Sequence, residues 1–180
     1  LLGGIRGIDT LTVYYYTGYG QGKELTGQMY PFADSSAIHF WLPSFYGPTL
    51  MQYMLPRWAP EPPRHSFLKH GLISLFDFSG QNYHASTIGY KNAGTLIPIS
   101  QLAVDTATNS NEERYQSAEA ASLCAYLLSD YGPMKLRELY LSNLSFDSSC
   151  AQFLGQPVDS VQSRWLQFIK SYVPKDSIRD

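Results

Sequence analysis

GPTLMQYMLPRWAPEPPRHSFLKHGLISL, residues Gly47 to Leu75, is the part of the chain that most clearly indicates how it folds. Its first half has the frame of a helix that carries two histidine ligands one turn apart, with a glutamate after the first. Such residues hold zinc and activate a metal-bound water. The three places are occupied here by Gln52, Tyr53 and Pro56, so the zinc ligands and the general base are both missing.

The second half of the stretch opens another helix after the prolines of Ala59–Arg64. In its frame the stretch resembles the active site of bacterial gluzincins of the peptidase MA-like type. In that family the second helix opens with Glu-Gly-Leu and supplies a glutamate as third ligand. The corresponding residues are His70-Gly71-Leu72, so the resemblance implies a degenerate member that has lost the third ligand as well.

The resemblance extends over nearly the whole chain, through short motifs in a consistent order. They are the strands Leu11–Tyr16 and Ile38–Pro43, the Gly-rich connection that ends at Glu24–Gly27, Pro31–Asp34, Asn82–His84, Gly94–Ile99, the helix from Tyr115 to Tyr131, Lys135–Leu139, Ser145–Asp147, and Gly155 with Ser160–Leu166.

The expected fold class is α+β and zincin-like. A small N-terminal sheet, with Ile38–Leu42 as an edge strand, is expected to pack on the active-site-like helices, and a C-terminal helical bundle follows. We expect a single domain in three parts: mainly strands over 1–46, degenerate active-site helices and loops over 47–110, and a helical subdomain over 111–175.

Helix signals in the C-terminal third come from the residues themselves. Apolar residues from Tyr115 to Tyr131 recur at steps of three and four, which predicts one buried helix face. Gly132 and Pro133 predict the end of that helix and the start of the next. Ser145 is a predicted N-cap for a helix over 146–154, which Gly155 ends. The last predicted helix runs from Val158 to about Tyr172.

Composition limits the possible functions. The 180 residues are 44% hydrophobic and carry a formal net charge of −2, without a Lys/Arg cluster long enough to follow a phosphate backbone, so nucleic acid is not an expected partner. No apolar run is long enough to span a bilayer. Because the chain begins at Leu1 without Met, we expect a fragment or a processed form. The family resemblance favours an exported or cell-envelope location in bacteria.

Two cysteines, Cys124 and Cys150, are too few for a disulfide framework. Both stand at apolar positions of predicted helices. We expect two free, buried thiols, because a free cysteine behaves as a small hydrophobic residue. A single bridge between adjacent helices is the alternative in an exported protein.

The chain has four histidines, which are the candidate metal ligands. If the ligand set were rearranged, His65, His70 and His84 would form the alternative metal site. No ligand spacing supports it, and two helical histidines five residues apart do not face one ion. The simpler interpretation is that each histidine, His39 included, is a surface residue or a core residue with satisfied hydrogen bonds.

These observations predict a catalytically inactive, gluzincin-like pseudopeptidase that needs no cofactor and serves as a binding or structural module. A peptide segment or a partner protein would bind in the degenerate cleft, beside five residues. They are His39, Trp41, Gln52, Tyr53 and His70. The competing expectation is that the Ala59–Arg64 loop fills the cleft. Two other functions stay open: a metal-dependent hydrolase with ligands around His70, and a subunit of a larger assembly.

Overall fold

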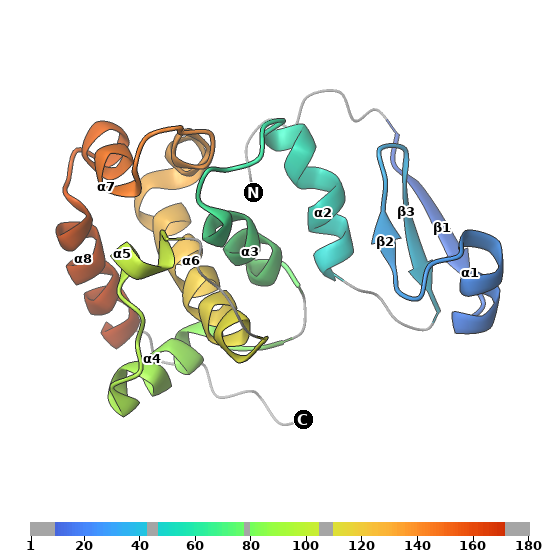
Figure 1. Cartoon of the computed structure of the whole chain (residues 1–180), viewed down its shortest axis with the longest axis horizontal. Coiled ribbons are helices and arrows are strands. Elements are labelled where there is room, and N and C mark those ends of the chain that lie inside the picture. The colour runs from blue at the N-terminus through green and yellow to red at the C-terminus, as the bar shows by residue number, and fades with distance from the viewer. Residues whose placement is uncertain (1–9, 43–46, 78–79, 105–109, 172–180) are drawn as a thin grey trace.

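The computed structural model describes residues 10–42, 47–77, 80–104 and 110–171. Its elements, in chain order, are β1 (Thr12–Tyr16), α1 (Tyr19–Thr26), β2 (Phe32–Ala33), β3 (Ala37–Trp41), α2 (Gly47–Trp58), α3 (Ser66–Leu75), α4 (Tyr83–Ala93), α5 (Ile99–Leu102), α6 (Ser110–Tyr140), α7 (Phe146–Ser149), the π-helical turn η1 (Cys150–Leu154) and α8 (Val158–Ser171). The small sheet lies at one end of the molecule, the helices α3 to α8 lie at the other, and α2 lies between them (Figure 1). The fold is mixed α and β, as expected.

Within the described residues, the sheet has three strands in the order β1, β3, β2. β1 runs parallel to β3, and β2 runs antiparallel to it. The expectation that Ile38–Leu42 is an edge strand is therefore wrong, because β3 is the central strand. The reason is a tight turn. The Asp34 carboxylate accepts hydrogen bonds from the backbone N–H groups of Ser36 and Ala37, and this turn folds β2 back onto β3.

Different helices cover the two faces of the sheet. On one face, Ile38 and Phe40 are buried against Tyr53 of α2. On the other face, α1 covers Trp41, and Gly22 approaches it so closely that a Cβ would lie 2.6 Å from the indole ring. α1 forms in the Gly-rich stretch that was expected to be a connection. Residues 1–9 and 43–46 of the expected strand region lie outside the described residues.

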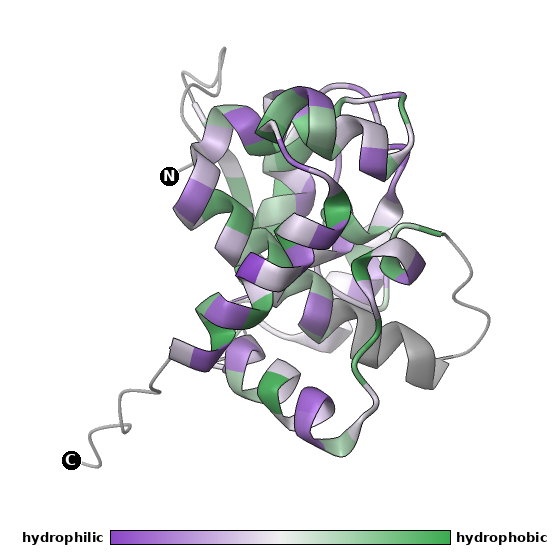
Figure 2. Ribbon diagram, turned by 90° about the vertical axis from the view of Figure 1, so that its left-hand side faces the viewer, coloured by the Kyte–Doolittle hydropathy of each residue, from purple (hydrophilic) through white to green (hydrophobic). Residues whose placement is uncertain are grey.

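The helical body is built around the contact between α3 and α6. Gly71 permits that contact, because a Cβ there would lie 2.5 Å from the carbonyl oxygen of Ala120. Helices of the body carry both hydrophilic and hydrophobic residues, as amphipathic packing requires (Figure 2). The largest apolar side chains that are fully buried in the body are Trp58, Leu68, Leu72, Ile99, Leu123, Leu127, Leu136, Leu139, Trp165 and Ile169.

The buried hydrophobic residues that the structure describes form two clusters. The larger one fills the helical body, and Met51 and Leu55 of α2 belong to it. The smaller one consists of Ile38, Phe40 and Tyr53, with partly buried neighbours. α2 contributes to both clusters, so one helix joins the sheet to the body.

Local signals in the C-terminal third are confirmed. Gly132 has φ 80° and ψ 171°, a conformation that favours glycine, and it divides α6 into two helices with Pro133 at the start of the second. The Ser145 hydroxyl accepts a hydrogen bond from the Ser148 N–H at the start of α7. Gly155 ends η1 in the left-handed region. α8 is described to Ser171, and Tyr172 lies outside the described residues.

The two cysteines are free and fully buried, as expected, and no bridge joins them. Burial raises the pKa of both the Cys124 and the Cys150 thiol to about 12, so neither is a thiolate at neutral pH. Among the described helices, none is long and apolar enough to cross a membrane.

Candidate functional site

The degenerate motif lies on α2, and its residues face two directions. Gln52 and Pro56, one turn apart, are exposed and line a pocket of about 200 Å³. Pro56 does not end the helix at once, since α2 continues to Trp58 and the Ala59 N–H donates to the Leu55 carbonyl at 2.7 Å. The two positions predicted for histidine ligands therefore lie on the surface of α2 and carry a glutamine and a proline.

Tyr53, at the place of the general base, points to the sheet. Its side chain is 4% exposed and packs in the smaller core cluster. The Arg57 guanidinium lies 3.5 Å from the centre of the Tyr53 ring. Arg57 also donates to the carbonyl oxygens of Tyr53 and Ser35, at 2.7 and 2.6 Å. Tyr53 and Arg57 thus hold α2 against the turn between β2 and β3, which is a structural role.

His70, at the place of the third ligand, is exposed on α3 and does not line the pocket. Its neighbour Lys69 does. Gly71 and Leu72, which follow His70, are buried against the body. On α3, the residue that shares the pocket with Gln52 is therefore Lys69. The family frame instead predicts the next residue, His70, at this place.

The Pro-rich loop also forms part of this pocket. Four consecutive residues, Ala59 to Pro62, line it together with α2. Hydrogen bonds fix both ends of the loop: Arg137 Nε donates to the Trp58 carbonyl, and Arg64 donates to the Asn143 carbonyl, each at 2.5 Å. The chain's own loop therefore forms one wall of the pocket beside Gln52 and Pro56.

The alternative ligand set is not assembled. His65 is buried, with Nδ1 3.1 Å from the Ala103 carbonyl oxygen and Nε2 3.1 Å from that of Leu144. The His84 ring contacts the hydroxyl of Ser122 on α6, and His70 is exposed on the surface of α3. Within the described parts of the chain, no group of three or more His, Cys, Asp or Glu side chains could hold a metal ion.

The remaining cleft candidates, His39 and Trp41, lie on the sheet face that α1 covers. His39 Nδ1 is 2.8 Å from the Tyr16 hydroxyl, and its Nε2 is 3.4 Å from the Asp34 carboxylate. The His39 ring stacks on Phe32 with 4.3 Å between ring centres. Since Tyr53 is on the opposite face, the five predicted residues do not share one cleft.

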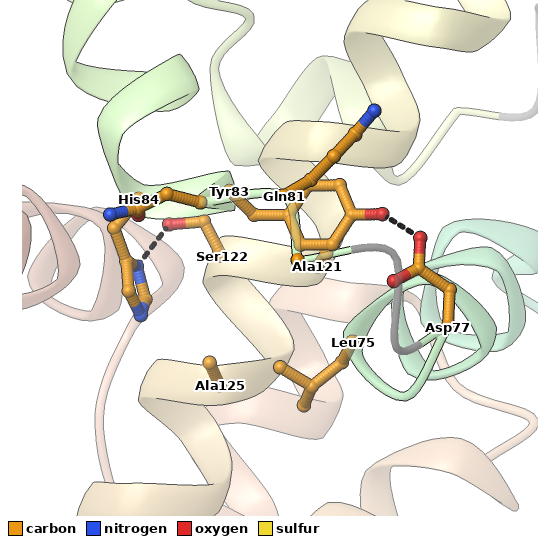
Figure 3. Close-up of a pocket in the computed structure, with 10 residues that line it drawn as sticks. Leu75, Asp77, Gln81, Tyr83, His84, Ala121, Ser122 and Ala125 are labelled. Carbon is orange, nitrogen blue, oxygen red and sulfur yellow. Dashed lines mark hydrogen bonds between the residues drawn. The ribbon is translucent and has the colours of Figure 1, made fainter. Parts of the chain in front are cut away.

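A second pocket, of about 340 Å³, was not predicted. It lies between the end of α3, the start of α4 and α6 (Figure 3). The Tyr83 hydroxyl donates to the Asp77 carboxylate on one side of it. On the other side, His84 Nδ1 is 3.0 Å from the Ser122 hydroxyl, which also receives the Trp165 indole N–H at 3.1 Å.

The indole N–H of Trp165 donates to Ser122 Oγ, and the same oxygen lies within hydrogen-bond distance of His84 Nδ1. Burial lowers the pKa of His84, which favours the neutral ring. Ser122 is 0% exposed, so this serine and histidine connect α4, α6 and α8 rather than present a nucleophile.

The sequence holds little signal for this pocket. Asn82 is a readable N-cap, since its side chain accepts from the Ala85 N–H at 3.0 Å. The pairing of His84 with Ser122 joins residues of different helices at no interpretable spacing. Comparisons with protein-family models, with curated proteins and with solved structures find no match to this chain.

Proposed function

We propose that this chain is a catalytically inactive, gluzincin-like domain that serves as a protein-binding module, and that its N-terminal sheet is the binding surface. The side chains at the three motif positions support the first part. Gln52 is a poor zinc donor, Pro56 has no donor, and Tyr53 is part of the core. The same fold can keep its architecture after its chemistry is gone.

The observation that carries the second part is the distribution of exposed apolar side chains. Among the described residues, most of the large ones lie in the short N-terminal segment. They are Leu11, Tyr14, Tyr15, Tyr19, Leu25, Met29, Tyr30 and Leu42. Four of these eight side chains are tyrosines, and tyrosine is enriched in binding hot spots.

The outer edge of β1 provides main-chain partners beside these side chains. The Leu42 N–H donates to the Tyr16 carbonyl at 2.8 Å, so the polar backbone groups of Tyr16 face β3. Backbone groups of neighbouring residues in a strand point to opposite sides. Those of Val13 and Tyr15 therefore face outward, where no other described strand pairs with β1.

The partner that fits is an extended polypeptide segment. It would add a strand to the sheet through the backbone of Val13 and Tyr15, and its side chains would contact the tyrosines on either face. β1 has the sequence TVYYY, without the charged residues or prolines that protect edge strands from pairing. Tyr14 is 51% exposed and Tyr15 is 57% exposed, so both rings are accessible.

A matched pair of variants tests the proposal. Peptides selected from a random displayed library would be titrated against the wild type, Tyr15→Val and Tyr15→Pro. Both variants lose the ring, but only Tyr15→Pro loses the outward N–H. We expect Tyr15→Pro to bind at least about tenfold more weakly than Tyr15→Val. Equal affinity of the two variants, or the absence of new hydrogen-exchange protection at the Val13 and Tyr15 amides, would exclude strand addition.

A further inference from the structure

The pocket beside Gln52 and Pro56 carries unused polar groups. Its walls come from α2, from the Pro-rich loop and from the ends of α3 and α6. The lining residues are Gln52, Leu55, Pro56, Ala59, Pro60, Glu61, Pro62, Lys69 and Tyr140. Two of them carry opposite charges, and neither Glu61 nor Lys69 forms an ion pair with any residue that the structure describes.

Hydrogen-bond acceptors are supplied by Glu61 and by α2. The Glu61 carboxylate is exposed at the pocket. In a regular helix, each backbone carbonyl accepts from the N–H of the residue four positions later. Pro56 has no N–H, so the backbone carbonyl of Gln52 lacks this donor. An ammonium group has three donors and is suited to such a set of acceptors.

Hydrogen-bond donors are supplied by Lys69 and Tyr140. Tyr140 is 3% exposed, and its hydroxyl has no hydrogen-bond partner within the described part of the chain. Burial raises the pKa of Tyr140 to about 12, with the nearby Cys124 as a second cause, so the hydroxyl keeps its hydrogen at neutral pH. A carboxylate accepts from a lysine ammonium and a hydroxyl through its two oxygens.

The volume of the pocket and the rigidity of its walls favour a small ligand. Pockets for drug-sized ligands hold about 300–1,000 Å³. This pocket, at about 200 Å³, suits a smaller molecule. Three prolines line it, and prolines reduce the freedom of the unbound loop. A preorganised wall lowers the entropic cost of binding.

We propose that this pocket binds a small zwitterion of the amino-acid class. Its ammonium group contacts Glu61 and the Gln52 carbonyl, and its carboxylate contacts Lys69 and Tyr140. A ligand with both charges complements a pocket lined by one carboxylate and one ammonium group. This site is separate from the β1 edge, so either proposal can fail without the other.

The probes are glycine, β-alanine, 4-aminobutyrate and 6-aminohexanoate, which differ only in the distance between their two charges. Each would be titrated into isotope-labelled protein, and the NMR chemical shifts of the backbone amides would be followed. We expect saturable shifts at Gln52, Ala59, Glu61 and Lys69, with one preferred chain length. Propylamine and butyrate, with one charge each, should bind at least about tenfold more weakly, since each loses a charge-assisted contact.

Variants assign the contacts. Tyr140→Phe keeps the ring and removes only the hydroxyl, while Lys69→Gln and Glu61→Gln each remove one charge. We expect each to weaken binding of the preferred zwitterion by about tenfold. Lys135→Gln, whose lysine pairs with Glu138 outside the pocket, is the control and should bind as the wild type does. No saturable shifts, equal binding of the singly charged probes, or equal loss in the control would overturn the proposal.

Discussion

Ser122 shows how much one hydroxyl can connect. Its buried oxygen accepts from the Trp165 indole of α8 and lies 3.0 Å from His84 Nδ1 of α4. We predict that Ser122→Ala lowers the free energy of unfolding by about 1–3 kcal/mol, because the buried indole N–H loses its acceptor. Urea denaturation measures the loss. Ser163→Ala is the control, because this exposed hydroxyl donates to the Asp159 carbonyl of its own helix, and it should change stability by less than about 0.5 kcal/mol. Equal effects of the two would contradict the role of Ser122.

Glu119 is a buried carboxyl with one partner. Its Oε1 accepts from the Ile97 N–H at 3.0 Å, and its Oε2 has none among the described residues. Burial raises the pKa of Glu119 from 4.5 to about 7, so the folded chain holds this proton more tightly than the unfolded chain. Its contribution to stability is therefore complete below pH 4.5 and is lost as the pH rises toward 7.

Glu119→Gln should remove that dependence. Between pH 5 and 7 we expect wild-type stability to fall relative to the variant by at most about 1.4 kcal/mol for each pH unit, the limit for one proton. Urea midpoints measured across this range give the difference. Parallel curves for the two proteins would show that Glu119 does not titrate in the window.

At the scale of elements, the relation between α2 and α3 decides whether a zinc site can be rebuilt. Lys69 lines the same pocket as Gln52 and Pro56, while His70 does not. We predict that Gln52→His with Pro56→His and Lys69→Glu binds zinc at least about tenfold more tightly than the same pair with His70→Glu. Zinc titration with a competing chelator measures both. Tighter binding by the His70→Glu protein would favour the family frame over the observed faces.

The elements that the sequence predicted correctly are those whose signals are local. Gly132 ends a helix because its φ of 80° favours glycine, and Ser145 caps one because its hydroxyl reaches a nearby N–H. The central place of β3 was missed, because strand order depends on a turn that Asp34 closes. The faces of α2 were missed for the same reason: burial of Tyr53 is a property of the sheet against which it packs.

The candidate site was predictable only in part. The sequence shows that Gln52, Tyr53 and Pro56 cannot bind zinc as a gluzincin does, since this follows from the side chains themselves. It does not show that Lys69 and Tyr140 share a pocket with Gln52, since that depends on how three helices pack.

For the molecule as a whole, metal content is the measurement that separates a binding domain from a hydrolase. We predict no stoichiometric zinc in protein purified without chelator, because His65 and His84 each bind other parts of the fold. Elemental analysis by mass spectrometry would check this. One equivalent of zinc that disappears in His70→Ala would instead indicate the rearranged site.

The two core clusters on either side of α2 imply unequal local stability. The smaller has three buried residues, Ile38, Phe40 and Tyr53. Fewer buried apolar contacts therefore stabilise the packing of the sheet on α2 than stabilise the helical body. Such regions open below the free energy of global unfolding. The strands should therefore exchange amide hydrogens and be cut by proteases while the helical body stays intact. A partner that adds a strand would stabilise the sheet against this local opening. Its binding would therefore be seen first as resistance of the strands to proteolysis.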